Sequence, residues 1–330
     1  MRQIIEKIIF NAKEQQASDI HITLESSFGS IRFRIKGEMI HYDSIKRQDY
    51  NKLINYLKFM ADLDINEHRL PQSGKTVIQN AHDSVSIRVS TLPISMMNEI
   101  IVVRLLLSET HLKQLKLFKS EEDISFLQDY VSKSQGLILF TGPTGSGKTT
   151  LMYQLILNEI QKSQRQVISI EDPIEYESDQ MVQVEINEKT AMNHENLLKG
   201  ALRCDPDILL FGEIRSKLVA ESLLKASLSG HLVMTTFHSK SAVATIERLK
   251  DYGLFKEEIR QSVSLIVNQR MIHTEDESLI IYEYITNEDI DALLSGLPIQ
   301  FKTIQDNLED LFKRAVINQD VYEKYAKQYE

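Results

Sequence analysis

The glycine-rich stretch 142–150 constrains the fold of this chain more than any other part of the sequence. It fits the phosphate-binding pattern G-x-x-x-x-G-K-[ST] without a mismatch, as Gly142-Pro143-Thr144-Gly145-Ser146-Gly147-Lys148-Thr149-Thr150. The apolar run 137–140 before it is typical of a buried strand, and the residues after it are typical of a helix. A strand, a tight turn and a helix in this order indicate an α/β fold with a nucleoside triphosphate site at the turn.

The residue types in this stretch match what phosphate binding requires. Glycines let consecutive backbone N–H groups face one centre, and the helix N-terminus adds the positive end of its dipole. Lys148 is predicted to reach the β- and γ-phosphates, and the Thr149 hydroxyl to ligate Mg²⁺. The alternative is a glycine-rich turn that matches by accident. The chain has only 12 glycines, so such an accident has a chance of roughly one per cent, and we predict ATP and Mg²⁺ as cofactors.

Length and composition limit the class of protein. A chain of 330 residues suggests about two domains. The net charge of −9 argues against a protein that coats nucleic acid, so no direct nucleic-acid binding is expected. Cys204 is the only cysteine, which excludes an intrachain disulfide and a cysteine-based zinc cluster. Because the sequence shows neither a signal-peptide core nor an apolar run long enough to span a bilayer, we expect a cytoplasmic protein. With a single cysteine, we expect no zinc.

Residues 1–107 are predicted to form a small α+β domain. Apolar side chains recur at helical spacing over residues 2–16, and residues 47–63 also indicate a helix. In the rest of this range, alternating or continuous apolar residues are typical of strands, and one strand face carries many arginines. The expected strands lie at 20–24, 31–36, 85–90 and 100–103.

Strands and helices alternate from residue 121 to residue 285, which predicts a mostly parallel sheet covered on both faces. Residues 108–120 show little periodicity and are predicted to be a linker. We expect residues 178–187 to form an edge hairpin and residues 286–330 to form a helical C-terminal segment. The expected strands of the sheet lie near 137–141, 166–171, 207–212 and 231–236.

Two of these strands end in a carboxylate. Glu171 follows the apolar strand at 167–170, and Glu213 follows the one at 208–212. Because the carboxyl ends of parallel strands meet at one edge of a sheet, both side chains are expected to point toward the γ-phosphate. One would hold Mg²⁺, and the other would orient or deprotonate the attacking water. The alternative, an acidic surface turn after each strand, keeps a chance of roughly one in four.

Two histidines bracket the strand at 231–236. His238 follows its carboxyl end, which is the phosphate side, where a neutral imidazole could sense the γ-phosphate through a hydrogen bond. His231 precedes the strand and is the weaker candidate, because a histidine at a strand edge more often has a structural role. No third ligand has the spacing that a metal site at these histidines would need.

Arg88 and Arg104 lie in the first predicted domain, far from Lys148 in the sequence. An isolated strand arginine usually lies on a solvated face. Phosphoryl transfer, however, needs positive charge at the γ-phosphate beyond the lysine and Mg²⁺, and a neighbouring domain or subunit can supply it. The residues alone leave both interpretations open.

Motifs along residues 17–285 resemble those of the traffic ATPases of type II secretion and type IV pilus assembly. In the first domain the matching stretches are Ala17-Ser18-Asp19-Ile20-His21, Arg32-Phe33-Arg34-Ile35-Lys36-Gly37, Arg69-Leu70-Pro71-Gln72, Arg88-Val89-Ser90-Thr91-Leu92-Pro93 and Val102-Val103-Arg104-Leu105-Leu106. In the second they are the phosphate loop, Ile170-Glu171-Asp172-Pro173-Ile174-Glu175, Leu202-Arg203, Asp205-Pro206-Asp207, Gly212-Glu213-Ile214-Arg215 and Gly230-His231 through His238. The matches follow one another in family order, which makes the resemblance highly specific.

The resemblance implies a RecA-like ATPase domain preceded by a PAS-like domain. It also implies residue roles: Glu171 resembles the general base, Glu213 the Walker B carboxylate that supports Mg²⁺, His231 and His238 the paired histidines of the nucleotide site, and Arg88 and Arg104 the arginines that reach the nucleotide from the N-terminal domain. Members of the family form hexameric rings. They act at the cytoplasmic face of the membrane on a polytopic inner-membrane platform protein of a pilus or pseudopilus machine.

The sequence departs from the family pattern at several points. Lys75 stands where the family motif Q-D-G-R has its arginine, so the charge is kept but the bidentate fork is not. Asn98-Glu99 replaces the usual Gly-Glu. The four-cysteine zinc module and the extra docking domain of larger members are not found in the sequence. This short, zinc-free pattern most resembles the competence ATPases of Gram-positive bacteria (ComGA type), which drive a pseudopilus for DNA uptake.

Two other functions stay open beside an assembly motor. A pilus-retraction ATPase would share most of these motifs, although the stretch Arg69-Leu70-Pro71-Gln72 favours assembly and residues 286–330 carry no retraction motif that we find. A nucleotide-gated scaffold with negligible turnover is the other alternative. Such a scaffold would have no use for Glu171, Glu213 and the two histidines.

Overall fold

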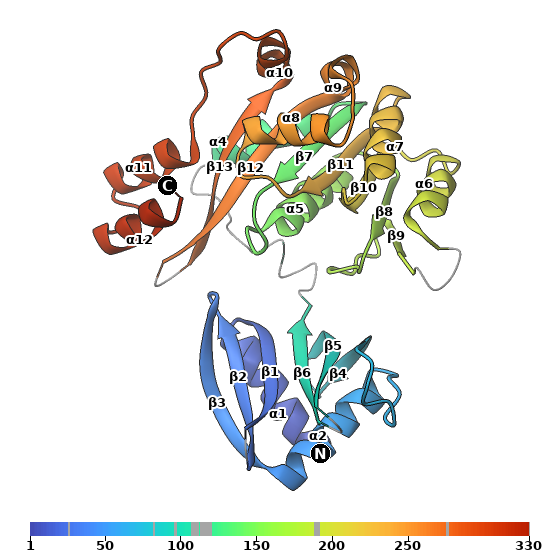
Figure 1. The fold of residues 1–330 in the computed structure, drawn as a ribbon, viewed down its shortest axis with the longest axis vertical. Helices are drawn as coiled ribbons and strands as arrows, with labels where there is room; N and C mark the ends of the chain where they lie inside the picture. The colour runs from blue at the N-terminus through green and yellow to red at the C-terminus, as the bar shows by residue number, and fades with distance from the viewer. Residues whose placement is uncertain are drawn as a thin grey trace. The chain divides into compact units, whose positions relative to one another are not determined.

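The computed structural model describes residues 1–25, 27–81, 83–95, 98–106, 112, 121–187, 192–274 and 277–329. Two compact units make up the chain, Met1–His111 and Leu112–Glu330 (Figure 1). The predicted linker 108–120 lies outside the described residues except for Leu112, so the domain boundaries expected from the sequence stay predictions. The predicted α/β class, a smaller α+β sheet unit followed by a mostly parallel sheet with helices, is confirmed.

In the described part of the first unit, six strands form an antiparallel sheet in the order β3-β2-β1-β6-β5-β4. Its elements are α1 (Arg2–Glu14), β1 (Ala17–Glu25), β2 (Phe28–Ile35), β3 (Glu38–Lys46), α2 (Arg47–Met60), β4 (Gln72–Gln79), β5 (Ser84–Ser95) and β6 (Asn98–Leu105). The two helices cover one face, because the Ile residues of α1 and the Leu and Ile residues of α2 share a buried core with the strands. The opposite face carries the polar side chains of the alternating strands, which are described below.

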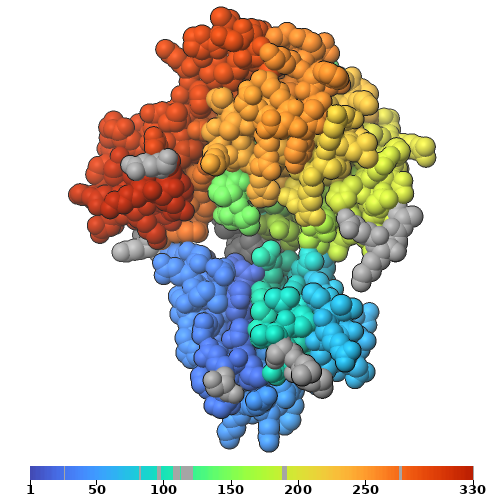
Figure 2. All heavy atoms as spheres, viewed as in Figure 1, coloured from blue at the N-terminus to red at the C-terminus, as the bar shows by residue number. Residues whose placement is uncertain are grey.

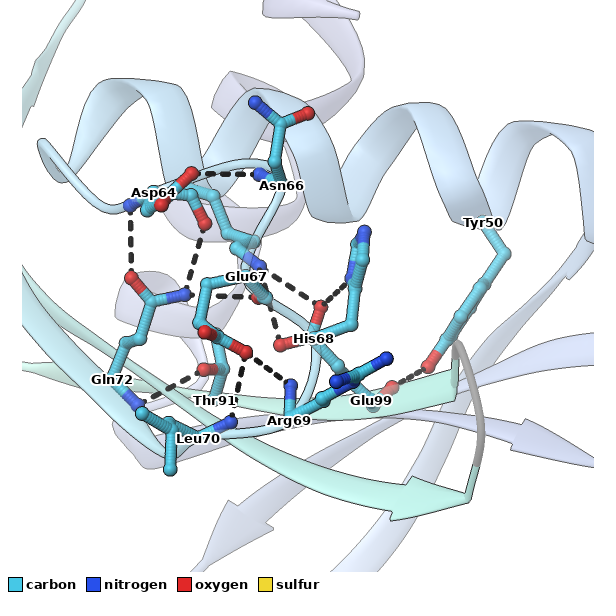
Figure 3. A network of polar contacts seen from close by, with 11 residues as sticks. Tyr50, Asp64, Asn66, Glu67, His68, Arg69, Leu70, Gln72, Thr91 and Glu99 are labelled. Atoms are coloured by element: carbon cyan, nitrogen blue, oxygen red, sulfur yellow. Dashed lines mark hydrogen bonds and ion pairs between the residues drawn. The ribbon is translucent and has the colours of Figure 1, made fainter.

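A buried polar network holds the segment between α2 and β4 (Figure 3). Lys58 Nζ is fully buried and donates to Glu99 Oε2 at 2.9 Å and to Glu67 O at 2.6 Å. His68 Nδ1 lies 2.7 Å from the same carboxylate oxygen, and Gln72 Nε2 donates to Glu67 O at 3.2 Å. Because the buried ammonium and carboxylate are each other's partners, they fix the path of the segment between α2 and β4.

In the described part of the second unit, seven strands form a sheet in the order β13-β12-β7-β11-β10-β8-β9, parallel except for the pair β12–β13. Its strands are β7 (Gly136–Thr141), β8 (Val167–Glu171), β9 (Val182–Glu185), β10 (Ile208–Glu213), β11 (Leu232–Phe237), β12 (Val263–His273) and β13 (Ser278–Thr286). Its helices are α4 (Glu121–Val131), α5 (Lys148–Lys162), α6 (His194–Leu202), α7 (Lys217–Leu228), α8 (Ala242–Asp251), α9 (Lys256–Ser262), α10 (Asn287–Leu294), α11 (Ile304–Lys313) and α12 (Gln319–Tyr329).

Both faces of this sheet are covered by helices (Figure 1). Leu137 and Leu139 of β7 share one core with side chains from α6, α7, α8, α9 and α10. Ile138 and Phe140 alternate with them and point to the other face, where α5 contacts β7 and α4 contacts α5. Strands buried on both faces need the continuous apolar runs that the sequence has.

Side-chain caps explain where several helices of this unit begin. Asn193, Ser216, Ser241, Thr286 and Thr303 each accept a hydrogen bond from a backbone N–H of the helix that follows. These residues satisfy donors that the first turn of a helix leaves without a partner. The predicted helical segment after residue 286 is accordingly seen as α10, α11 and α12.

A buried carboxylate ties two of these helices to the hairpin β12–β13. Glu283 is 4 % exposed. One of its oxygens accepts from Ala242 N at 2.7 Å, at the start of α8, and the other accepts from Ile304 N at 3.2 Å, at the start of α11. A negative charge at two helix N-termini is favourable because of their dipoles.

Two expectations about this unit are corrected. Residues 178–187 do not form an edge hairpin: β9 is a single edge strand that pairs in parallel with β8. The long antiparallel hairpin β12–β13 is not among the strands expected from the sequence. No helix among the described residues combines the length and hydropathy that crossing a membrane requires.

Replacing Glu99 by Ala should destabilise the first unit by roughly 3–5 kcal/mol, because Lys58 would then be buried without a carboxylate. Urea unfolding, with hydrogen exchange of peptides from this unit as the readout, measures the loss in the free energy of unfolding. Glu25→Ala is the matched control, since its ion pair with Arg32 is exposed and should contribute less than about 1 kcal/mol. Equal effects of the two substitutions would contradict the network's stabilising role.

Candidate nucleotide site

The glycine-rich loop joins the end of β7 to the start of α5. Gly142, Gly145 and Gly147 have φ angles of +137°, +80° and +81°, which only glycine adopts without strain. A Cβ on Gly142 would overlap Gln269 O, and one on Gly147 would lie 2.7 Å from Met271 Cε. The glycines therefore serve two purposes: they allow the turn, and they let the loop lie directly against β12.

Polar contacts fix the same loop from within and from below. Ser146 Oγ donates to Pro143 O at 2.9 Å, and the buried Gln269 Nε2 donates to Ser146 O at 2.7 Å. Thr144 is exposed at the tip, where a Cβ added to Gly145 would meet no atom within 4 Å. The loop is thus supported from the β12 side and open at its tip.

Lys148, the first residue of α5, points back into the loop. Its Nζ donates to Pro143 O at 2.8 Å and to Gly142 O at 3.1 Å. Burial lowers the pKa of Lys148 to about 8, while Glu213 and Glu175 act in the opposite direction. The lysine is therefore a buried cation with two carboxylates in its field.

The carboxyl ends of the parallel strands bring two predicted residues together. Glu213 ends β10 and His238 directly follows β11, which is paired with β10. His238 Nε2 lies 3.3 Å from Glu213 Oε2, and Arg215 Nε donates to Glu213 Oε1. Glu213, His238 and Lys148 thus form one electrostatic group at this edge of the sheet. Glu213 and the Thr149 hydroxyl are oxygen donors of the kind that Mg²⁺ prefers.

Glu171 ends β8 and is 2 % exposed. Its Oε1 accepts hydrogen bonds from Tyr153 OH and, at 2.8 Å, from Ser169 Oγ. Burial raises the pKa of Glu171 above its ordinary value. A carboxyl with a raised pKa suits a general base, but these contacts also hold the group among the side chains of α5 and β8.

Glu175 and Arg215 are two further charged residues at this edge, and neither was assigned a role from the sequence. Glu175 belongs to the acidic stretch that begins at Glu171 and raises the pKa of Lys148. Arg215 Nη1 donates to Asp172 Oδ2 at 2.6 Å, so its guanidinium links the ends of β8 and β10. The signal that could have found both residues is their place directly after apolar strands.

The structure does not bring His231 to the loop. It lies at the other end of β11, where Leu232 pairs with Gly136 at the start of β7, and its Nδ1 is 3.1 Å from Ala226 O. At the end of the loop, the Thr150 hydroxyl lies instead 2.7 Å from Tyr176 OH. Nucleotide binding by His231 therefore stays a prediction that the geometry of this chain does not support.

Arg88 and Arg104 lie directly opposite each other on β5 and β6. The same row continues with Lys75 opposite Arg88, and with Asp19 opposite Arg104. Arg88 Nε donates to Ser73 Oγ at 2.8 Å, and Arg104 Nε donates to Asp19 Oδ1 at 2.9 Å. Like charges opposite each other destabilise a sheet, so the pairs Arg88–Arg104 and Arg88–Lys75 are unfavourable for the sheet itself.

Comparison with known proteins places these features in context. The family model described as "Type II/IV secretion system protein" matches residues 1–288. The competence protein ComGA of Halalkalibacterium halodurans is 39% identical over 269 residues, which is 81% of this chain and 76% of that protein. The type II secretion system ATPase E of Vibrio cholerae is 37% identical over 273 residues, 82% of this chain but only 54% of that protein.

A solved structure agrees with the fold. The ATPase DotB of Legionella pneumophila superposes with a TM-score of 0.80 at 20% identity, over 99% of this chain and 96% of that one. At this identity the likeness concerns the fold alone.

Replacing Glu171 by Gln should stabilise the folded chain at neutral and alkaline pH. The raised pKa means that the folded state holds this proton more tightly than the unfolded state. The free energy of unfolding therefore falls as the pH rises from the ordinary value through the raised pKa. Glutamine has no proton to lose, and its carbonyl oxygen can accept the same two hydrogen bonds.

Thermal unfolding midpoints of wild type and variant, measured from about pH 5 to about pH 9, test this expectation. Glu177→Gln is the control, because Glu177 lies in the same acidic stretch with an exposed side chain. Parallel curves for wild type and Glu171→Gln over the whole range would show that the buried carboxyl has no such effect.

Proposed function

The chain belongs to the type II/IV secretion system protein family, and we propose that it is an ATP hydrolase that drives the assembly of a pilus or pseudopilus. One observation carries the proposal: Lys148 lies inside a glycine loop of phosphate-binding geometry, in the field of the carboxylates of Glu213 and Glu175. A competence role is favoured by the identity to ComGA over most of both chains.

In this proposal the chain's own groups bind and orient the nucleotide. The backbone N–H groups of the loop 142–150, of which Pro143 has none, and the N-terminus of α5 hold the phosphates, and Lys148 exchanges its carbonyl contacts for phosphate oxygens. Thr149 and Glu213 would hold Mg²⁺, which when bound neutralises charge that develops on the phosphates. His238, held beside Glu213, is suited to donate a hydrogen bond to the γ-phosphate.

The general base is assigned to the acidic stretch after β8. Glu171 is our first candidate, because burial raises its pKa and a base with a raised pKa accepts a proton more readily. Glu175 is the second, supported by its electrostatic coupling to Lys148. Arg215 keeps this stretch at a fixed distance from Glu213 through its contact with Asp172.

The remaining features of the proposal concern the assembly. We assign residues 1–107 to an N-terminal domain, 121–285 to the ATPase domain and 286–330 to a C-terminal segment. The basic row with Arg88 and Arg104 would supply positive charge to a γ-phosphate within a homo-oligomer, expected to be a hexamer. The partner expected is a polytopic inner-membrane platform protein, met at the cytoplasmic face of the membrane.

The two alternatives are less well supported. A retraction ATPase would need the same nucleotide site, so the site alone does not exclude it. A scaffold with negligible turnover would not need an organised group of Glu213, His238 and Arg215 around Lys148. Phosphate release in the presence of ATP and Mg²⁺ separates the scaffold from both motors.

Lys148→Ala and Glu171→Gln should each lower the rate of phosphate release by about 100-fold or more, as expected when a phosphate-binding cation or a general base is lost. Glu175→Gln, measured beside them, decides which carboxyl is the base. Glu177→Gln in the same stretch is the control and should keep the wild-type rate, since its side chain is exposed. A full rate in Glu171→Gln with a lost rate in Glu175→Gln would move the assignment to Glu175.

Arg88→Ala and Arg104→Ala should lower kcat about tenfold or more while the Kd for ATP stays within about threefold, because these arginines would act on the transition state. Arg32→Ala on β2, two strands away from β6, is the control, since Arg32 forms its ion pair with Glu25 and not with the row. Light scattering with ATP and Mg²⁺ shows whether each variant still assembles. A monomeric wild type under these conditions would contradict the oligomer.

A further inference from the structure

The helices α11 and α12 lie beyond the family model, which ends at residue 288. They are nevertheless packed within the second unit. Ile304, Leu308 and Tyr325 share a core with Ile272 and Leu279 of the hairpin β12–β13. Figure 2 shows the atoms of the C-terminal segment (red) as one continuous surface with those of the preceding residues (orange). The helices α11 and α12 are therefore fixed against the hairpin that contains the strand next to β7.

Helix α12 is bonded to the part of β12 that supports the phosphate loop. Tyr329 OH donates to Met271 O at 3.0 Å, and His273 N donates to Tyr325 OH at 2.9 Å. The side chain of Met271 lies beneath Gly147, as described above. Two tyrosines thus connect the end of the chain to the strand that backs the phosphate loop.

Arg270 lies between α12 and the nucleotide site. Its guanidinium carbon is 5.8 Å from the centroid of the Tyr329 ring, within the range of a cation–π contact. Nη1 donates to Asn268 Oδ1 at 2.8 Å, and Nη2 donates to Lys240 O at 2.6 Å. Its Nη1 also lies 3.4 Å from the position of a Cβ built on Gly142, which places it beside the phosphate loop.

The contact with Lys240 O is part of a larger pattern. Three consecutive carbonyls after β11 are each held by a side chain from another segment: His238 O by Arg248 Nη1, Ser239 O by Asn268 Nδ2 at 3.2 Å, and Lys240 O by Arg270. A surface loop held at every carbonyl has little freedom to move. The loop is thus fixed where His238 meets Glu213.

We propose that α12 fixes Arg270, and that Arg270 holds the loop 238–240 so that His238 keeps its place beside Glu213. Arg270 and Tyr329 are then positioning residues, and the C-terminal helices are a support for the nucleotide site that the family match does not include. The chemical consequence rests on the proposed ATP hydrolysis, whereas the structural consequence does not.

The side chain of Arg270 has the properties that this role requires. It is half-buried, and burial lowers the pKa of Arg270 below its ordinary value. Only a planar fork can reach Asn268 and Lys240 O at once, so lysine would not replace it. The Tyr329 ring covers a cation whose described hydrogen bonds go to neutral oxygens.

The test compares three variants of the full chain with wild type: Arg270→Lys, Tyr329→Leu and, as a matched control, Tyr322→Leu. Tyr322 is also on α12, but its ring stacks on Phe312 at 4.8 Å and has no described contact with Arg270. Two readouts are used. Hydrogen exchange of peptides spanning residues 238–242 reports the loop directly, and steady-state kinetics report kcat and KM for ATP.

We expect Arg270→Lys and Tyr329→Leu to raise exchange in the 238–242 peptides and to lower kcat by about tenfold, because a misplaced group near the reacting atoms costs rate more than binding. KM should change less than about threefold. Tyr322→Leu should leave the exchange of these peptides and both kinetic constants near wild type.

Wild-type exchange in Arg270→Lys would overturn the proposal, and so would equal effects of Tyr322→Leu and Tyr329→Leu, which would indicate a general loosening of the helices. If the wild-type chain does not hydrolyse ATP, the proposed function fails, but exchange of the 238–242 peptides still decides the positioning role. The two failures are therefore distinguishable.

Discussion

The close contact between the phosphate loop and β12 is the constraint on which the rest of the second unit depends. Gly142 and Gly147 can touch Gln269 and Met271 only because they lack a Cβ, and Gln269 bonds Ser146 across the same contact. The strand order then follows, since β12 must lie directly beside β7. With the loop fixed from below, Lys148 can be buried inside it and still face the open tip.

The parallel strands bring several charged residues to one edge of the sheet. Parallel strands end on the same side, so Glu171, Glu213 and His238, which are far apart in the sequence, lie at the same edge of the sheet. The charges there have specific partners, although Arg215 and His238 are half exposed. Arg215 and His238 each take one oxygen of Glu213, and the field of the carboxylates offsets part of the burial of Lys148.

Sequence reasoning succeeded where a short pattern sets local structure and failed where only tertiary contacts decide. The turn of the phosphate loop and the strands of the parallel sheet follow from apolar runs and from the ends of those runs. The contact of His238 with Glu213 was not predicted, because it depends on which strands pair. The hairpin β12–β13 was not predicted, although its two strands are neighbours in the sequence. The contacts of Arg215 with Asp172 and of Arg270 with Lys240 O join distant segments, so no sequence pattern shows them. Register likewise revealed the row in which Arg88 meets Arg104 and Lys75.

The double role of Glu283 has a practical consequence for shortening this protein. Its carboxylate accepts from the start of α8, inside the segment that the family model matches, and from the start of α11, after that segment. A cut at the end of the shared segment would deprive that buried anion of one of its two donors and strip the apolar cover from Ile272 and Leu279. A shortened version should therefore keep α11, whose first backbone N–H completes the hydrogen bonds of Glu283.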